Sequence, residues 1–340
     1  MNSQRTIRRF CVALVISTFM VATSQAADWI RAGLNTNRPV WGLRGGLLFA
    51  IHPGGFSPGE GGPRGLIRIG YPTLPGGGYD LINFIAVEPV VNGRRGLSEL
   101  EHSDLDDRRG KRFWVGPSKP ATNAVSKLEP GQVSSPSAGV EELAVTVFIE
   151  QFRNGARVRL VLAQRSDTPD ELRLTVHAEP GSAAMDSCIL SATMGNKART
   201  RLLWLKEGPV SSLELYPDYR GWGFTPHTLF ALDRLPRSAN GDVLVAVSND
   251  EEDPAAVKSF DRLPFWNYRG AKVTQYWRKP ATQVRDDLQC TVNGRFTYWM
   301  SLQPIPGGIA YENFELREKF RSGQQVVFGV TRRTPPGLLK

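Results

Sequence analysis

Cysteine and histidine are scarce in this chain, and common catalytic motifs are absent. The 340 residues contain three cysteines and four histidines. There is no G-x-S-x-G nucleophile elbow, no H-E-x-x-H zinc motif and no zinc-finger, RRM or KH pattern. The glycine run at residues 76–78 does not open a helix and so does not predict a phosphate loop. The function therefore has to be inferred from weaker signals.

Long apolar runs are also missing. The run Phe10–Ala22 is shorter than the roughly 20 residues that a transmembrane helix needs. It follows three arginines and precedes Ser24-Gln25-Ala26, whose small residues suit signal peptidase. Residues 1–26 are therefore predicted to be a secretory signal peptide. Residues 27–340 are predicted to form an exported protein, periplasmic or extracellular, without a membrane span.

The charge distribution bears on the class of binding partner, and the cysteine content bears on a disulfide. The formal net charge is +9, but basic residues are interleaved with acidic ones and form no stripe. This distribution does not favour nucleic acid, and it is compatible with an anionic partner such as an acidic glycan. Export makes a disulfide between Cys188 and Cys290 possible, with two buried free thiols as the alternative.

The chain instead contains many short apolar runs separated by turns. Thirty-four glycines and 24 prolines fall largely between these runs. Alternation is clear in 143–149 and 158–162, which flank the turn signal Asn154-Gly155. Residues 212–215 are predicted as a further strand, and Asn293-Gly294 as the turn of a second hairpin.

These signals predict one fold class. No amphipathic pattern predicts a long helix, and strand-like runs recur every 8 to 15 residues. The expectation is a large antiparallel β-sandwich, or supersandwich, with few or no long helices. Residues 27–340 are predicted to form a single large all-β domain, with a possible weak boundary at 131–139. The oligomeric state stays open.

Carboxylates are densest just after the turn at Asn92-Gly93. Glu99, Glu101, Asp104 and Asp106 lie within eight positions of one another. Such oxygens can bind a hard cation, so a calcium site is one interpretation. The EF-hand spacing is absent, and neighbouring arginines make a solvated mixed-charge loop the alternative.

Aromatic residues gather in loop-like contexts. Tyr219, Arg220 and Trp222 lie in one glycine-flanked segment, and Trp266 lies in another. Exposed rings beside polar groups suit a sugar, whose face stacks on the ring while its hydroxyls form hydrogen bonds. Aromatic residues also fill sandwich cores, which is the alternative.

The C-terminal segment resembles galactose-mutarotase-like proteins. The resemblance is carried by Ile309–Leu316, then Phe320–Gln324 and Val327–Val330, about 25 residues in all. It implies closing strands of an all-β, carbohydrate-directed fold, with Glu312 as base and His177 or His227 as acid. Ser322 replaces the proline that the family pattern expects, and the family's histidine motif has no counterpart upstream.

Two functions remain open from the sequence. The first is a secreted protein that binds, or binds and processes, a carbohydrate in an aromatic-lined groove. The second is a non-catalytic envelope or extracellular interaction module, with or without stabilisation by calcium. A sugar site needs rings and polar groups that converge, whereas an interaction module needs a flat apolar patch.

Overall fold

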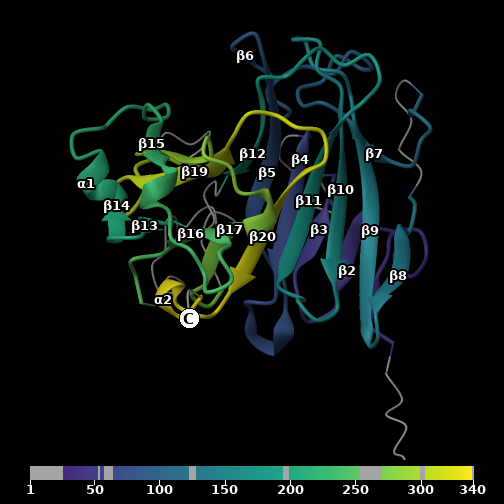
Figure 1. The fold of residues 1–340 in the computed structure, drawn as a ribbon, viewed down its shortest axis with the longest axis horizontal. Coiled ribbons are helices and arrows are strands. Elements are labelled where there is room, and N and C mark those ends of the chain that lie inside the picture. Colours follow the sequence, from purple (N-terminus) through teal and green to yellow (C-terminus); the bar gives the residue numbers. More distant parts are fainter. Residues whose placement is uncertain are drawn as a thin grey trace, which may run out of the picture.

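Strands dominate the structure, a computed structural model that describes residues 26–52, 54–56, 64–121, 128–193, 199–252, 270–298 and 303–338. They form two antiparallel sheets, which confirms the predicted all-β sandwich without long helices (Figure 1). The predicted signal peptide lies outside the described residues, apart from Ala26, and so does Trp266. No helix in the described part of the chain is long and apolar enough to span a membrane.

The first sheet has the spatial order β1-β2-β3-β4-β5-β12-β19-β18-β15, and β6 pairs with β5. Its strands are β1 (Trp29–Ile30), β2 (Val40–Leu43), β3 (Leu48–Ala50), β4 (Leu66–Tyr71), β5 (Asp80–Val91), β6 (Arg94–Arg95), β12 (Ser187–Thr193), β15 (Thr228–Ala231), β18 (Gln289–Arg295) and β19 (Ala310–Arg317).

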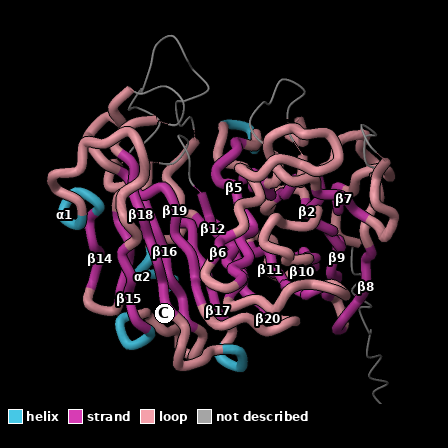
Figure 2. Tube along the Cα trace, turned by 90° about the horizontal axis from the view of Figure 1, so that it is seen from above, coloured by secondary structure: helices cyan, strands magenta, loops and turns pink. Residues whose placement is uncertain are grey.

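The second sheet has the order β14-β13-β16-β17-β20-β11-β10-β9-β7, and β8 pairs with β9. Its strands are β7 (Phe113–Val115), β8 (Gln132–Ser137), β9 (Val140–Ile149), β10 (Val158–Arg165), β11 (Glu171–Ala178), β13 (Leu202–Leu205), β14 (Gly208–Ser211), β16 (Val243–Ser248), β17 (Thr274–Lys279) and β20 (Gln324–Thr331). The α-helices described are α1 (Ser212–Leu215) and α2 (Pro335–Leu338), each a single turn (Figure 2).

The core lies between the sheets and follows from the alternation of apolar residues. Inward-facing side chains of β9, β10 and β11 are buried in the same cluster as those of β12, β18 and β19. Trp277 of β17 packs on Phe314 of β19 and edge-on against Phe328 of β20, at 6.3 and 5.1 Å between ring centroids. Its indole nitrogen donates to the Phe314 carbonyl oxygen at 3.0 Å. This aromatic group ties the second sheet to the first.

Two local predictions were wrong. Residues 212–215 form α1 because the Ser211 hydroxyl accepts a hydrogen bond from the Leu213 amide and caps the helix. Asn293-Gly294 lies inside β18, at a shift of register against β19. A Cβ at Gly294 would lie 3.0 Å from the Ala310 carbonyl oxygen, so glycine here permits close approach of two strands rather than a turn.

The segment suggested as a weak boundary is part of the second sheet. Residues 132–137 form β8, which pairs with β9 through a turn at Gly139 with φ of +73°. The Asn154-Gly155 turn signal is confirmed, since it lies between the paired strands β9 and β10.

Candidate functional site

The outer face of the first sheet is polar where β12, β19 and β18 lie side by side. Because side chains alternate along a strand, the residues between core positions point away from the second sheet. On these three strands those outward positions hold Thr193, Thr291, Asn293, Asn313 and Glu315. We call these five residues the polar floor.

Hydrogen bonds join the polar floor across the strands. The Thr193 hydroxyl donates to Asn313 Oδ1 at 2.7 Å, and Asn293 Oδ1 accepts from the Asn313 amide at 3.2 Å. The Thr291 hydroxyl donates to Glu315 Oε1 at 2.8 Å. Thr193 and Asn313 are half-buried, whereas the other three residues are buried. The floor is therefore a fixed polar surface with partly exposed members.

Arg95 holds two carboxylates together on this face. Asn92 and Gly93 both have positive φ, of 48° and 72°, and turn the chain from β5 into β6. The Arg95 guanidinium then donates to both oxygens of Glu315, at 2.9 and 3.1 Å, and also pairs with Glu88. One guanidinium thus joins carboxylates from β5 and β19.

The carboxyl groups around Arg95 outnumber the single positive charge that its guanidinium supplies. Burial raises the pKa of Glu88 well above its ordinary value, Arg95 opposes this rise, and Glu315 adds to it. Burial also raises the pKa of Glu99. The Arg95 charge acts to lower this pKa, and the Glu315 charge acts to raise it. Burial and the neighbouring negative charges therefore favour the neutral forms of Glu88 and Glu99 more than in an exposed carboxyl.

His227 stands at the edge of the floor, just before β15. Its Nε2 lies 3.4 Å from Asn293 Nδ2 and 3.7 Å from Glu315 Oε1, and 38% of its side chain is exposed. Burial lowers its pKa, while the Glu315 carboxylate acts in the opposite direction. The imidazole is therefore neutral at pH 7 and able to accept a proton.

Glu312 lies at the irregularity between β18 and β19. Tyr311 and Phe314 both pack in the core, a spacing of three that a regular strand does not give. Burial raises the pKa of Glu312 to about 7, against the lowering effect of nearby Arg295. Burial in turn lowers the pKa of Arg295. Near neutral pH this carboxyl is therefore close to half-ionised.

An aromatic loop of residues 216–227 runs past this point. Trp222 is 68% exposed and Phe224 is 41% exposed. The Tyr219 hydroxyl donates to the Phe224 carbonyl oxygen at 3.0 Å, which fixes the loop internally. Arg295 lies over the Phe224 ring, at 5.2 Å from the centroid.

The loop is also pinned to β18. The Thr225 amide donates to the Gly294 carbonyl oxygen, and the Gly294 amide donates to the Thr225 hydroxyl, each at 2.9 Å. The Arg220 guanidinium lies 5.2 Å from the centroid of the Phe296 ring. The loop that carries the exposed rings is thus held by its backbone against β18, a strand of the polar floor. α1, β15 and β19 lie on the same side of the molecule in both views (Figures 1 and 2).

The structure separates His177 from the other proposed catalytic residues. His177 is on β11, opposite Arg159 of β10 on the outer face of the second sheet. Burial lowers its pKa, and Arg159 lowers it further. Because the core lies between the two outer faces, His177 does not meet Glu312. His227 lies beside the first sheet, 3.7 Å from the carboxylate of Glu315.

The four carboxylates proposed for calcium face different partners. Glu101 accepts from the Leu97 and Arg153 amides, at 3.3 and 2.9 Å, and lies 3.5 Å from the buried Lys111 ammonium. Asp104 lies 3.7 Å from the same ammonium. Lys111 thus supplies a positive charge inside the loop.

The remaining two carboxylates point elsewhere. Two hydrogen bonds from Arg64, at 2.6 and 2.9 Å, hold the pKa of Asp106 well below its ordinary value. Glu99 belongs to the cluster around Arg95. Over the part of the chain that the structure describes, no group of three His, Cys, Asp or Glu side chains is arranged to hold a metal ion.

Cys188 and Cys290 are buried free thiols, and burial raises the pKa of both above the ordinary thiol range. They lie on β12 and β18, with β19 between them. Two strand spacings amount to roughly 9.5 Å, more than the Cα separation that a disulfide tolerates. The structure therefore has no bridge between them.

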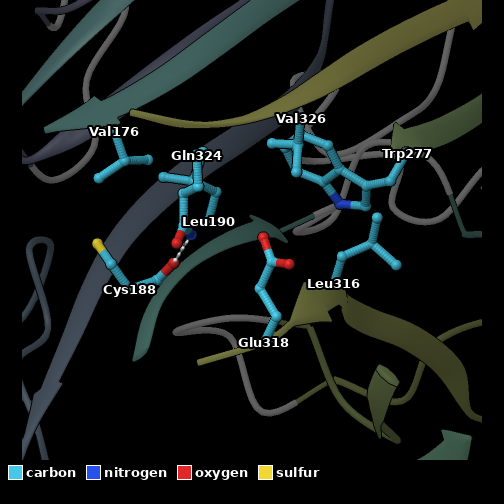
Figure 3. Close-up of a pocket in the computed structure, with 8 residues that line it drawn as sticks. All are labelled: Val176, Cys188, Leu190, Trp277, Leu316, Glu318, Gln324 and Val326. Carbon is cyan, nitrogen blue, oxygen red and sulfur yellow. Dashed lines mark hydrogen bonds between the residues drawn. The ribbon is translucent and has the colours of Figure 1, made fainter. Parts of the chain in front are cut away.

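A cavity between the sheets is too small for a sugar ring. Its volume of about 10 Å³ admits roughly one water molecule. The residues that line it are Val176, Cys188, Leu190, Trp277, Leu316, Glu318, Gln324 and Val326 (Figure 3). Gln324 Nε2 donates to the Cys188 carbonyl oxygen at 3.3 Å, and Glu318 pairs with buried Lys279.

Comparisons with protein-family models, curated proteins and solved structures find no significant match to this chain.

Sequence reasoning missed Arg95, Glu88 and Glu315, which form the centre of the outer-face network. Glu315 lies three positions from Glu312, so regular alternation would put the two on opposite faces of β19. The shift of register against β18 changes that pattern, and it is seen only in the structure. Arg95 follows the Asn92-Gly93 turn, which was recognised. A hairpin folding an arginine back over β5 was the signal that could have identified it.

Proposed function

We propose that the protein binds a carbohydrate on the outer face of the first sheet. The observation that carries the proposal is that the loop bearing exposed Trp222 and Phe224 is hydrogen-bonded to β18, a strand of the polar floor. A sugar ring stacks one apolar face on the indole, and its hydroxyls reach Asn313, Thr193 and His227. Such a site combines a large aromatic contact with a few directed hydrogen bonds.

The fixed backbone of the aromatic loop supports this proposal. Trp222 costs little conformational entropy on binding, because Tyr219, Thr225 and Gly294 already hold the loop in place. A large exposed ring gains nothing for folding. A sugar that stacks on this ring buries its apolar face, which is the contribution the proposal assigns to Trp222.

Processing of the bound sugar is the second candidate. Glu312 is a buried carboxyl with a pKa of about 7, and His227 is a partly exposed imidazole whose pKa is lowered by burial. Glu312 can exchange a proton near neutral pH and the neutral His227 ring can accept one, as general acid–base catalysis requires. In this proposal His227 acts on the sugar, with Glu315 orienting its ring.

A glycan array tests binding, with purified residues 27–340, Trp222→Ala and Leu34→Ala compared side by side. Leu34 is 63% exposed and lies on a different part of the chain, so it is a matched control for loss of an exposed apolar side chain. The proposal expects one glycan class bound by the wild type and Leu34→Ala and lost in Trp222→Ala. Binding that persists in Trp222→Ala contradicts the site. No binding by the wild type favours the interaction module, whose patch would include Leu229, 48% exposed.

Any glycan that binds is then incubated, at saturating concentration, with wild type, His227→Gln and Glu312→Gln. The processing proposal expects a changed sugar product with the wild type and an unchanged ligand with His227→Gln, and Glu312→Gln tests whether the buried carboxyl is also required. If the wild type leaves every bound glycan unchanged, the protein is a binding protein only. Export is tested separately, since the proposal expects the secreted protein to begin at Ala27.

A further inference from the structure

Charges on the outer face of the first sheet lie at two depths. The carboxylates are beneath: the side chains of Glu88 and Glu315 are 6% and 1% exposed. The arginines are above: 29% of the Arg95 side chain is exposed, and Arg317 and Arg220 are exposed residues. A ligand that approaches this face meets guanidinium groups before it meets carboxylates.

Arg317 extends this arrangement along β19. It lies two positions beyond Glu315 and so on the same face. It is also close enough to His227 to lower the pKa of that imidazole. The exposed end of the floor is therefore positively charged at the edge where His227 stands.

Arg220 supplies the second exposed cation, on the aromatic loop. Its Nη1 donates to the Pro217 and Tyr219 carbonyl oxygens, both at 2.9 Å. A guanidinium has five N–H groups, so three further donors remain on a side chain whose position is already fixed. This is a pre-organised anchor for an oxyanion.

The other charges near this face are of both signs. Asp218 is exposed two positions from Arg220, and exposed Arg109 adds a positive charge near Glu99. Burial raises the pKa of both Glu88 and Glu312 and so favours their neutral forms, which reduces the negative charge beneath the arginines. The exposed layer stays positive as pH falls.

We propose that the glycan taken by this face carries anionic groups, carboxylate or sulfate, that pair with Arg317 and Arg220. The inference rests on the proposed function, and it adds the chemical class of the sugar. Arginine binds carboxylate and sulfate oxygens through two parallel N–H groups, a geometry that neutral hydroxyls do not match.

The test compares polymers that differ in charge alone. Polygalacturonate and its fully methyl-esterified form share a backbone, a sulfated galactan supplies the second anion, and polyglutamate is a polyanion without sugar. Affinities are measured by calorimetry at low and high salt. We expect at least one acidic polysaccharide to bind about tenfold more tightly than the methyl ester and than polyglutamate, with the difference shrinking at high salt.

Arg317→Gln and Arg220→Gln are expected to weaken the acidic polysaccharide about fivefold to tenfold each, and to leave a neutral glycan unaffected. Arg165→Gln is the matched control, since Arg165 is a partly exposed arginine of β10 whose partner is Asp167. Tighter binding of the carboxylated or of the sulfated polymer identifies which anion the arginines bind.

The outcomes separate this inference from the proposed function. Equal binding of acidic and esterified polymers, with loss in Trp222→Ala, keeps the carbohydrate site and overturns the charge inference. Equal binding of polyglutamate overturns it as well, because attraction is then unspecific. Equal weakening by Arg165→Gln has the same meaning. Binding of no polysaccharide, acidic or neutral, overturns the proposed function itself.

Discussion

The outer faces of the two sheets differ in how deeply they bury the carboxylates that pair with arginine. On the second sheet, Arg173 pairs with Glu142 and Arg159 pairs with Glu179, each through a single contact between partly exposed side chains. Arg278 of the same sheet joins two carboxylates, Glu171 and Asp242, which are 17% and 9% exposed. On the first sheet, Arg95 joins two carboxylates that are almost fully buried. The first arrangement gives solubility at little energetic cost or gain, whereas the second costs desolvation of several charges.

Strand geometry differs in the same way. β9, β10 and β11 pair in continuous register, and their alternation is visible in the sequence. β18 and β19 shift register at Asn293/Gly294, and two residue pairs join β12 to β19 in the described part of the chain. Irregular pairing and buried charge coincide on one face. Structures tolerate such costs at functional sites, which is why the first sheet is the face proposed for the ligand.

The largest expected effect compares an arginine from each face. Arg95→Met leaves Glu88 and Glu315 without their shared cation and should lower the free energy of unfolding by about 3 kcal/mol. Arg159→Met breaks a partly exposed pair and should cost less than about 1 kcal/mol. Urea unfolding of both variants measures the difference.

A double variant sharpens this comparison. Adding Glu88→Gln to Arg95→Met removes one unpaired carboxylate and should recover part of the lost stability. Equal losses in the two single variants, or no recovery in the double variant, would show that the Arg95 cluster is an ordinary surface pair.

The free energy of unfolding should depend on pH differently for Glu312 of the first sheet and for the two histidines. A carboxyl whose pKa is higher in the folded state holds its proton there, so its stabilising contribution is lost as pH rises. Glu312, with a pKa of about 7 against an ordinary 4.5, should lose roughly 3 kcal/mol between pH 4.5 and pH 7. Glu312→Gln should therefore gain stability relative to the wild type across that window.

His227 and His177 act with the opposite sign, because their pKa values are lowered and folding favours the neutral ring. Their contributions increase stability as pH rises towards 6.5. Denaturant midpoints at several pH values isolate Glu312 as the difference between wild type and variant. A difference that stays constant with pH contradicts the raised pKa.

A smaller effect compares the two histidines in glycan binding. His227→Ala removes a hydrogen-bonding group beside the floor and should weaken binding about fivefold to tenfold. His177→Ala lies on the other face and should leave affinity unchanged. Titration of the glycan found on the array measures both. Equal effects would mean that neither face is specific to the ligand.

The smallest effect concerns the acidic loop. Glu101, Asp104 and Asp106 already have Lys111 and Arg64 as cationic partners, so EDTA should shift the melting temperature by less than about 1 °C. Added calcium should have no effect either. A calcium-dependent rise of several degrees would restore the calcium site as a proposal.

The sequence predicted the fold class because alternation on β9, β10 and β11 reports directly which side chains face the core. It also placed Trp222 in an exposed loop. It could not give the network around Arg95, since Glu315 lies 220 positions beyond Arg95 in the sequence, although Glu88 and Arg95 belong to one hairpin. Pairing across β5, β12 and β19 is set by tertiary packing.

The Asn293-Gly294 signal was misread for a related reason. The dipeptide permits either a tight turn or close approach of strands, and local sequence does not choose between them. The choice is made by Tyr311 and Phe314, which both pack in the core and impose the shift of register. Glu312 was proposed from a resemblance, and its neighbour Arg295 follows from the structure alone.

Hydrogen–deuterium exchange with and without the bound glycan tests the central claim most directly. The account predicts slower exchange confined to residues 219–228, 291–295 and 313–317, with β9, β10 and β11 unchanged. Protection on the second sheet, or none on the first, would contradict the assignment of the ligand to the outer face of the first sheet.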